Sequence, residues 1–200
     1  MKVTYNWLKD FVDIKIPAEE LAHKLTMAGL EVVSCQAQGE DFVFEIEITS
    51  NRPDWLSVLG IAREVAALTN SKLKNKTIKY PPKTVKNTGF KIEIEDKKDC
   101  PLYTARIIKG VKVGQSPEWL RKRLELLGCR SVNNVVDITN YVLFELGEPL
   151  HAFDLNRLSP GKIVVRRAKP GERIMTIDAQ ARILSKDVLV IADKDKAVAI

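Results

Sequence analysis

The amino-acid sequence predicts an α+β protein made of two folded units. Three observations lead to this prediction: helix signals occur in both halves, strand-like runs lie among them, and a lysine-rich stretch without helical periodicity divides the halves. The chain has 200 residues, of which 45% are hydrophobic and 29% are charged. This composition is too apolar for a disordered chain and too mixed for a low-complexity one.

The first unit, residues 1–70, combines helices with one strand. Pro17 opens a helix that Gly29 stops, because proline suits the first turn and glycine suits the position past the last one. Asp54 follows a proline in a turn and can cap the next helix. The elements predicted for this unit are helices over 6–12, 17–29 and 56–70 and a strand over 42–48.

The second unit is predicted to hold two helices and several strands. One helix starts at Ser116-Pro117-Glu118, with Ser116 as the capping hydroxyl, and stops at Gly128. Another runs from Ser131 to Leu146, and Gly147 follows it. The strands predicted for this unit cover 90–95, 103–113, 163–165, 173–177 and 188–191.

The chain ends on an apolar run, residues 197–200, that has no cap, turn or polar tail. A half-made strand in such a place would leave backbone groups unpaired. We therefore expect the chain to be a fragment of something longer.

The net charge of +6 comes from one segment. Residues 70–98 carry nine lysines against three acidic residues, so the rest of the chain is neutral. The segment also contains Pro81-Pro82, and we interpret it as a linker with a solvated lysine face. The alternative is an arm that contacts phosphates, but the segment has no arginine and little aromatic character for stacking on bases.

Composition and motifs also exclude several classes of protein. No apolar run reaches the roughly 20 residues that span a bilayer, and the start lacks the apolar core of a signal peptide. Cys35, Cys100 and Cys129 are scattered, so they indicate neither a disulfide framework nor a zinc site. The sequence has no glycine-rich phosphate loop and no His-Glu-x-x-His motif. We expect a cytoplasmic protein with no membrane partner and no metal ligands.

The helix before Gly147 has an unusual polar stripe. At about 100° per residue, the stripe comprises Asn133, Asp137, Asn140 and Phe144, and the opposite side, predicted to meet the core, comprises Val135, Ile138, Val142 and Leu146. Asparagine and aspartate are poor residues in a helix interior, because their side chains compete for the backbone. The stripe therefore indicates hydrogen bonding, either to a ligand or within a buried polar network.

His151 lies on the loop that follows this helix. It comes after Gly147-Glu148-Pro149-Leu150, a helix stop and a stiff turn, and loops of this kind often carry function. The alternative is a histidine that closes the turn by a local hydrogen bond. The other histidine, His23, is expected on the surface of the helix over 17–29.

Two stretches around His151 form long motifs. Residues 130–142, Arg-Ser-Val-Asn-Asn-Val-Val-Asp-Ile-Thr-Asn-Tyr-Val, and residues 145–154, Glu-Leu-Gly-Glu-Pro-Leu-His-Ala-Phe-Asp, resemble the β subunit of bacterial-type phenylalanyl-tRNA synthetase. Residues 51–54 with 60–68, and residues 165–168 with 189–193, resemble other parts of the same family. The resemblance covers essentially the whole chain apart from the lysine-rich linker.

The resemblance implies a fold and a domain order. Residues 1–70 would be the family's small first α+β domain (B1-like), and residues 71–98 would be the lysine-rich linker and first strand. Residues 99–200 would start a mixed β-sheet and helix domain of the editing type (B3/B4), which is incomplete at its C-terminal end. The tRNA-binding barrel that many members insert into the first domain is missing, because residues 34–39 run almost directly into the next strand.

The resemblance also implies an activity and partners. In that family an α subunit and the β subunit form an (αβ)₂ heterotetramer, which uses ATP and magnesium to join phenylalanine to its tRNA. The α subunit holds that site, and the β subunit carries an editing site that hydrolyses tyrosine wrongly attached to the phenylalanine tRNA. Because part of the editing domain lies beyond Ile200, we expect the isolated chain to be inactive and to bind no cofactor.

Four site residues follow from the resemblance. His151 would be the catalytic residue of the editing site, near the ester and the terminal adenosine. Arg130 would contact the nucleotide or its phosphate, and Thr139 and Asn140 would form part of the pocket, with a positioned water attacking the ester. Two alternatives are a free-standing deacylase that edits in trans and a non-catalytic tRNA-binding or assembly module of the same fold.

Overall fold

The computed structural model describes residues 1–74, 89–159, 161–176 and 178–200. Its contacts divide the chain into two compact units. Unit 1 comprises Met1–Lys79 and Lys112–Ala152, and unit 2 comprises Tyr80–Val111 and Phe153–Ile200. Each unit therefore draws on two stretches of the sequence, so packing does not follow the contiguous domains that we predicted over 1–70, 71–98 and 99–200. Those domain bounds, which concern the family's domain order, stay a prediction.

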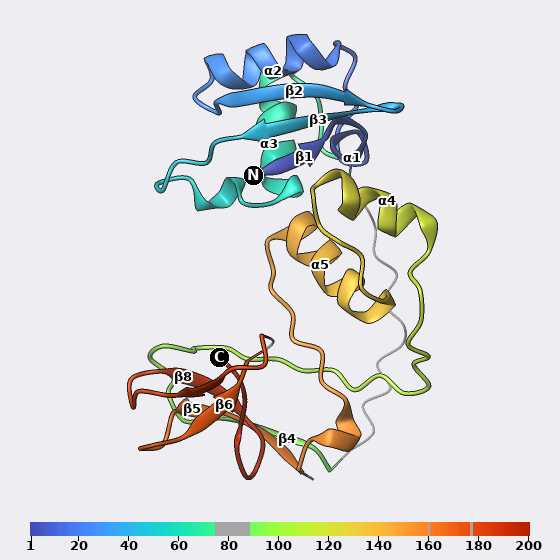
Figure 1. Cartoon of the computed structure of the whole chain (residues 1–200). Coiled ribbons are helices and arrows are strands. Elements are labelled where there is room, and N and C mark those ends of the chain that lie inside the picture. Colours follow the sequence, from blue (N-terminus) through green and yellow to red (C-terminus); the bar gives the residue numbers. More distant parts are fainter. Residues whose placement is uncertain (75–88, 160, 177) are drawn as a thin grey trace. The chain divides into compact units, whose positions relative to one another are not determined.

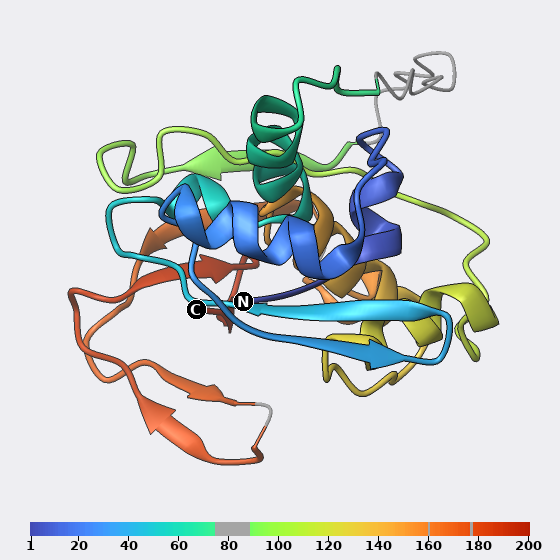
Figure 2. The same ribbon diagram turned by 90° about the horizontal axis from the view of Figure 1, so that it is seen from above.

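A three-stranded antiparallel sheet forms one side of unit 1. Its strand order is β1 (Lys2–Thr4), β3 (Asp41–Ile46) and β2 (Val32–Gln38). The helices α1 (Tyr5–Lys9), α2 (Ala18–Met27) and α3 (Val58–Leu68) pack against it, and α2 lies along the strands (Figures 1 and 2). The core between these layers includes Trp7, Leu21, Leu25, Phe44, Ile61 and Val65, all fully buried.

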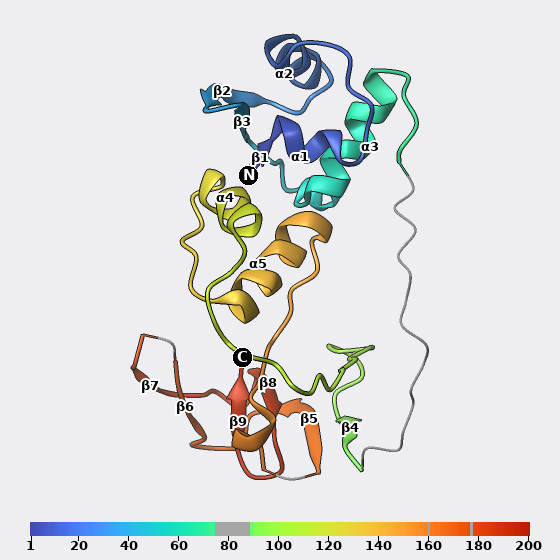
Figure 3. The ribbon, with the colours of Figure 1, turned by 90° about the vertical axis from the view of Figure 1, so that its right-hand side faces the viewer.

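Two helices from the second half of the sequence complete unit 1. They are α4 (Glu118–Leu126) and α5 (Asn134–Leu146). Leu127, just after α4, belongs to the core of unit 1, and Tyr141 and Phe144 of α5 pack against that core. The Trp7 ring stacks on the Tyr141 ring with centroids 4.8 Å apart. This contact brings together residues far apart in the sequence, so α4 and α5 are part of the first unit's packing (Figure 3).

The helix ends mostly follow the sequence signals. Gly147 has φ of 78°, the left-handed conformation that ends α5. Two capping predictions are wrong. The cap of α3 is Ser57, whose Oγ accepts a hydrogen bond from the Gly60 amide at 3.0 Å, whereas Asp54 pairs with Arg52. Ser116 does not cap α4, because its hydroxyl donates to Asp137 instead.

Unit 2 is built on a four-stranded mixed sheet. The strand order is β4 (Lys91–Ile94), β5 (Lys162–Arg167), β8 (Leu189–Ala192) and β9 (Ala197–Ala199), with β4 parallel to β5 and the other neighbours antiparallel. A hairpin of β6 (Arg173–Met175) and β7 (Ala181–Ile183) accompanies it. The short 3₁₀ helices η1 and η2 cover Pro53–Trp55 in unit 1 and Leu155–Arg157 in unit 2.

The α+β class is confirmed by these elements, and one predicted strand is wrong. The described residues 101–117 form no strand. Leu102, Ile108 and Val113 are 76%, 72% and 68% exposed, respectively. Apolar and β-branched residues favour a strand only where a neighbouring strand accepts their backbone hydrogen bonds. Half of the predicted linker, residues 75–88, lies outside the described residues, as does Ile177 at the end of one predicted strand.

The described residues include no helix that is both long enough and apolar enough to cross a membrane.

Candidate functional site

The four residues that the sequence singled out all belong to unit 1 and are arranged around α5. Arg130 lies on the loop before α5, Thr139 and Asn140 lie within the helix, and His151 follows it. Arg130 and His151 are exposed, and Thr139 and Asn140 are half-buried. After Gly147 the chain turns back and runs beside α5 (Figures 1 and 3). The helix and its two flanking segments therefore form one candidate site.

The loop before α5, residues 128–133, is held by a buried carboxylate. Asp137 has no exposed surface, and its Oδ2 accepts hydrogen bonds from the hydroxyls of Ser116 and Ser131, each at 2.5 Å. Its Oδ1 accepts from the Val132 amide at 2.9 Å. Burial by itself would raise the pKa of Asp137, but the two hydroxyls and the amide outweigh it and hold that pKa below its ordinary value. Asp137 is therefore a fully hydrogen-bonded anion.

Two asparagines fix the start of α5. Asn133 caps the helix, since its Oδ1 accepts from the amides of Val135 and Val136, each at 3.0 Å. Asn134 holds the segment before α4: its Nδ2 donates to the Lys112 carbonyl at 2.9 Å, and its Oδ1 accepts from the Gly114 amide at 3.2 Å. These contacts explain why consecutive asparagines occur at this position.

The predicted orientation of α5 is wrong, because the polar stripe faces inward. Asp137 is fully buried and Phe144 packs against the core, whereas Ile138 and Leu146, predicted to meet the core, are 53% and 49% exposed. The Asn140 amide Nδ2 lies 3.5 Å from the Cys129 sulfur, a weak hydrogen bond inside the unit. Of the two interpretations left open by the sequence, these contacts support the buried polar network.

Thr139 lies on the side of α5 away from Asp137. Two residues along a helix turn about 200°, which places Thr139 with the exposed Leu143 and Leu146 rather than with the stripe. Its hydroxyl donates to the Val136 carbonyl at 2.7 Å and keeps lone pairs that can accept a hydrogen bond from a ligand. Of the two helix residues, Thr139 therefore lies on the outward side and Asn140 is used internally.

A second polar cluster docks α5 onto the rest of unit 1. Glu145 accepts hydrogen bonds from the Trp7 indole at 2.9 Å and from the Tyr141 hydroxyl at 2.5 Å. Arg123 of α4 donates to the Tyr141 hydroxyl at 3.2 Å and pairs with Asp10 at 2.6 Å. Burial is the larger cause and the hydrogen bond to Glu145 is the second, and together they raise the pKa of Tyr141 to about 12. Sequence reasoning missed this cluster, because no spacing relates residues 7 and 10 to residues 141 and 145.

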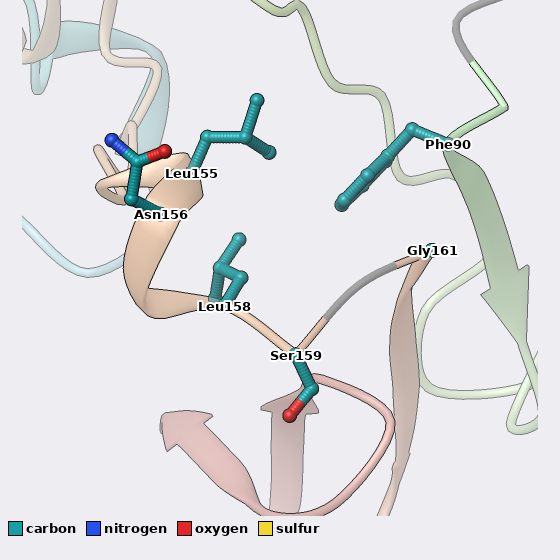
Figure 4. Close-up of a pocket in the computed structure, with 6 residues that line it drawn as sticks. All are labelled: Phe90, Leu155, Asn156, Leu158, Ser159 and Gly161. Atoms are coloured by element: carbon teal, nitrogen blue, oxygen red, sulfur yellow. The ribbon is translucent and has the colours of Figure 1, made fainter.

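One cavity lies in unit 2, and none of the predicted site residues lines it. It has a volume of about 400 Å³ and is lined by Phe90, Leu155, Asn156, Leu158, Ser159 and Gly161 (Figure 4). Within the described part of the chain, no group of three His, Cys, Asp or Glu side chains could hold a metal ion.

Comparison with known proteins identifies the class. The family model described as the B3/4 domain matches residues 99–200, about half of the chain. The chain therefore belongs to the B3/4 domain family.

The curated relatives of this chain are β subunits of phenylalanine–tRNA ligases. The chain is 45% identical over 201 residues to the phenylalanine–tRNA ligase β subunit of Rhodopirellula baltica, covering all of this chain and 30% of that subunit. It is 52% identical over 167 residues to the corresponding subunit of Geobacter metallireducens, covering 80% of this chain and 20% of that one. The resemblance inferred from the motifs is thereby confirmed. The chain spans only a fifth to a third of these relatives.

Two further matches complete the comparison. The alignment with the β subunit of Syntrophotalea carbinolica runs over 317 residues at 35% identity and covers 39% of that subunit. Because this chain has 200 residues, that relative contains a long stretch without a counterpart here. A crystal structure of an N-terminal fragment of the phenylalanyl-tRNA synthetase β subunit from Pyrococcus horikoshii matches with a TM-score of 0.48 and 17% identity, over 98% of this chain and 59% of that one.

Proposed function

We propose that this chain is part of the β subunit of a phenylalanine–tRNA ligase and contributes to a site that edits mischarged tRNA. The observation that carries the proposal is the 45% identity to such a subunit along the entire chain. The complete enzyme would pair this subunit with an α subunit in an (αβ)₂ heterotetramer in the cytoplasm. ATP and magnesium would bind the other subunit.

The need for editing follows from the chemistry of the two amino acids. An apolar pocket shaped for phenylalanine rejects an analogue that merely adds a hydroxyl by only about 10²-fold. A second site that hydrogen-bonds the hydroxyl can select tyrosine for hydrolysis. Water would attack the acyl carbonyl carbon, the ester bond to the terminal ribose would break, and the ribose oxygen would take up a proton to release tyrosine and intact tRNA.

The arrangement around α5 supports a division of roles. Arg130 projects from the loop before α5 and offers a guanidinium that suits a phosphate of the tRNA end. His151 is exposed on the segment that returns beside the helix, and a neutral imidazole there can accept a proton from the attacking water. Thr139, on the outward side of α5, would contribute to the pocket wall. Asn140 would support the pocket from inside the unit.

The test is hydrolysis of tyrosyl-tRNA carrying the phenylalanine anticodon by the complete two-subunit enzyme. We expect His151→Ala to slow deacylation by about 10²-fold, since general acid–base groups contribute on that order or more. Attachment of phenylalanine should stay unchanged, because it uses another site.

The second histidine of the chain supplies the matched control. His23 is exposed on α2, so His23→Ala removes the same side chain from a surface position of the same unit. Equal deacylation rates for the His151→Ala enzyme and the unmodified enzyme would refute the role of His151. If the unmodified enzyme itself fails to deacylate tyrosyl-tRNA, the alternative of a non-catalytic module replaces the proposal.

A further inference from the structure

The residues on either side of Arg130 are both held by side chains of α5. Before it, the Cys129 sulfur lies 3.5 Å from the Asn140 amide nitrogen. After it, the Ser131 hydroxyl donates to Asp137 at 2.5 Å, and the Val132 amide donates to the same carboxylate at 2.9 Å. Arg130 itself is exposed. The loop is therefore anchored at both sides of an outward-facing cation.

Asp137 is the main anchor of the loop, and burying its carboxylate costs free energy. A buried carboxylate loses its hydration, and a well-packed apolar residue in its place is often no less stable. Asp137 recovers hydrogen bonds from three donors, two of which belong to the loop. It also lies in the first turn of α5, where the helix dipole favours an anion. Its location therefore fits a group that holds the loop in one conformation.

We propose that Asp137, assisted by Asn140, is a positioning residue that presents Arg130 in a fixed place to an anionic group of the tRNA acceptor end. This inference rests on the proposed function. A loop ordered before binding avoids the entropy cost of ordering it during binding, so the effect falls on substrate affinity. Asp137 and Asn140 themselves contact no substrate, which distinguishes them from Arg130.

Two serines offer a matched pair of variants. Both Ser116 and Ser131 donate a hydroxyl to the same oxygen of Asp137 at the same distance. Ser131 lies in the loop with Arg130, whereas Ser116 lies in the segment just before α4. In the complete enzyme we expect Ser131→Ala to raise KM for mischarged tRNA about threefold with little change in kcat, and Ser116→Ala to leave KM unchanged. Equal effects of the two variants would reduce Asp137 to a structural role and overturn the proposal.

A stronger variant tests whether Asp137 acts through Arg130. We expect Asp137→Asn to raise KM about tenfold in the unmodified enzyme and to add nothing in an Arg130→Ala background, because the two groups then act as one unit. An increase of equal size in both backgrounds would contradict the inference. Attachment of phenylalanine by the same preparations reports whether each variant is folded.

Hydrogen exchange separates this inference from the proposed function. Asp137→Asn should speed exchange of the Val132 amide and its neighbours in residues 128–133, and leave exchange in the sheet of unit 1 unchanged. Unaltered exchange in the loop overturns the inference whatever the enzyme does. If Arg130→Ala leaves KM unchanged while loop exchange responds to Asp137→Asn, the anchoring stands and the role given to Arg130 in the proposed function fails.

Discussion

The ion pair of Arg166 and Glu172 is a buried feature of unit 2 with a clear consequence for stability. The two side chains are 8% and 10% exposed, and two hydrogen bonds of 2.8 and 2.7 Å join them. Glu172 also accepts hydrogen bonds from the amides of Lys169 and Ala197, so it ties the turn after β5 to strand β9. The bond to Arg166 outweighs burial and lowers the pKa of Glu172 to about 2.

This shift predicts acid sensitivity of unit 2. The pKa of Glu172 is about 2 in the folded protein and about 4.5 when unfolded, so its stabilisation is complete above pH 4.5 and is lost as the pH falls toward 2. The free energy of unfolding that depends on ionised Glu172 is about 3 kcal/mol. We expect Glu172→Gln to destabilise unit 2 at pH 7 and to flatten the dependence of stability on pH between 4.5 and 2.

The measurement needs a probe inside unit 2. All three tryptophans, Trp7, Trp55 and Trp119, belong to unit 1, so fluorescence does not report on the pair. Amide signals of β5 and β8 during urea unfolding at several pH values do. Glu93→Gln is the control, because its pair with Lys162 is partly exposed and worth less than about 1 kcal/mol. An unchanged acid profile in Glu172→Gln would assign the sensitivity to other groups.

The polar stripe of α5 shows which properties of a helix can be predicted from its own residues and which cannot. The unusual composition correctly predicted hydrogen bonding at Asp137. The core-facing side of the helix was assigned from hydrophobicity, and that assignment is wrong. Asp137 is buried because Ser116 and Ser131 satisfy it, and these donors come from other segments. Periodicity assigns a polar side chain to solvent unless its partners are known. The partners of a buried carboxylate are a tertiary property.

Helix α3 begins at a crowded point that requires glycine. A Cβ atom added to Gly60 would lie 1.8 Å from the backbone carbonyl oxygen of Asp54, a distance at which the backbone must move. Asp54 is itself fixed by Arg52, whose guanidinium also pairs with Glu64 at 2.6 Å and lies over the Trp55 ring. The turn of residues 51–54 is therefore a rigid support for α3.

We expect Gly60→Ala to destabilise unit 1 by about 3 kcal/mol, because relieving the clash requires a backbone shift of the turn or the helix, and either shift costs free energy. Thermal unfolding followed by tryptophan fluorescence measures this loss, since every tryptophan lies in unit 1. Gly114→Ala is the matched control: a Cβ there meets nothing within 4 Å, so the change should stay within about 0.5 kcal/mol. Equal melting temperatures for the two variants would show that the turn adapts.

The elements that the sequence predicted best are those with local start and stop signals. Helices α2, α4 and α5 lie within or close to their predicted ranges, because proline or glycine marks an end of each. Strands β1, β2 and β7 were missed, and residues 103–113 were wrongly assigned as a strand. Strand pairing joins distant segments, such as β4 with β5 and β1 with β3. Local alternation does not reveal whether a partner exists.

The resemblance proposed candidate site residues in the chain, but it did not reveal how the molecule packs. The family match begins at residue 99, whereas packing assigns residues 112–152 to the unit that contains residues 1–79. The reason is a set of tertiary contacts: the Trp7 indole on Glu145, the Trp7 ring on Tyr141, and Asp10 with Arg123. The candidate site around α5 thus depends on the first 79 residues for its support.

This dependence predicts the behaviour of fragments. A fragment of residues 89–200 keeps the strands of unit 2 but lacks Trp7 and Asp10. The helices α4 and α5 have 9 and 13 residues, lengths that are marginal for helices without tertiary packing. We therefore expect amides in residues 118–146 to exchange hydrogen at rates typical of unfolded chains, while amides of β5 and β8 stay protected.

A fragment of residues 1–152 is the control, because it contains both stretches of unit 1. In it the amides of α4 and α5 should be protected as in the whole chain. If residues 118–146 are equally protected in the fragment 89–200, α4 and α5 fold without the N-terminal stretch of unit 1, and the contacts of Trp7 and Asp10 contribute little. If they are protected only in residues 1–152, that N-terminal stretch is required for the structure that holds Arg130 and His151 in place.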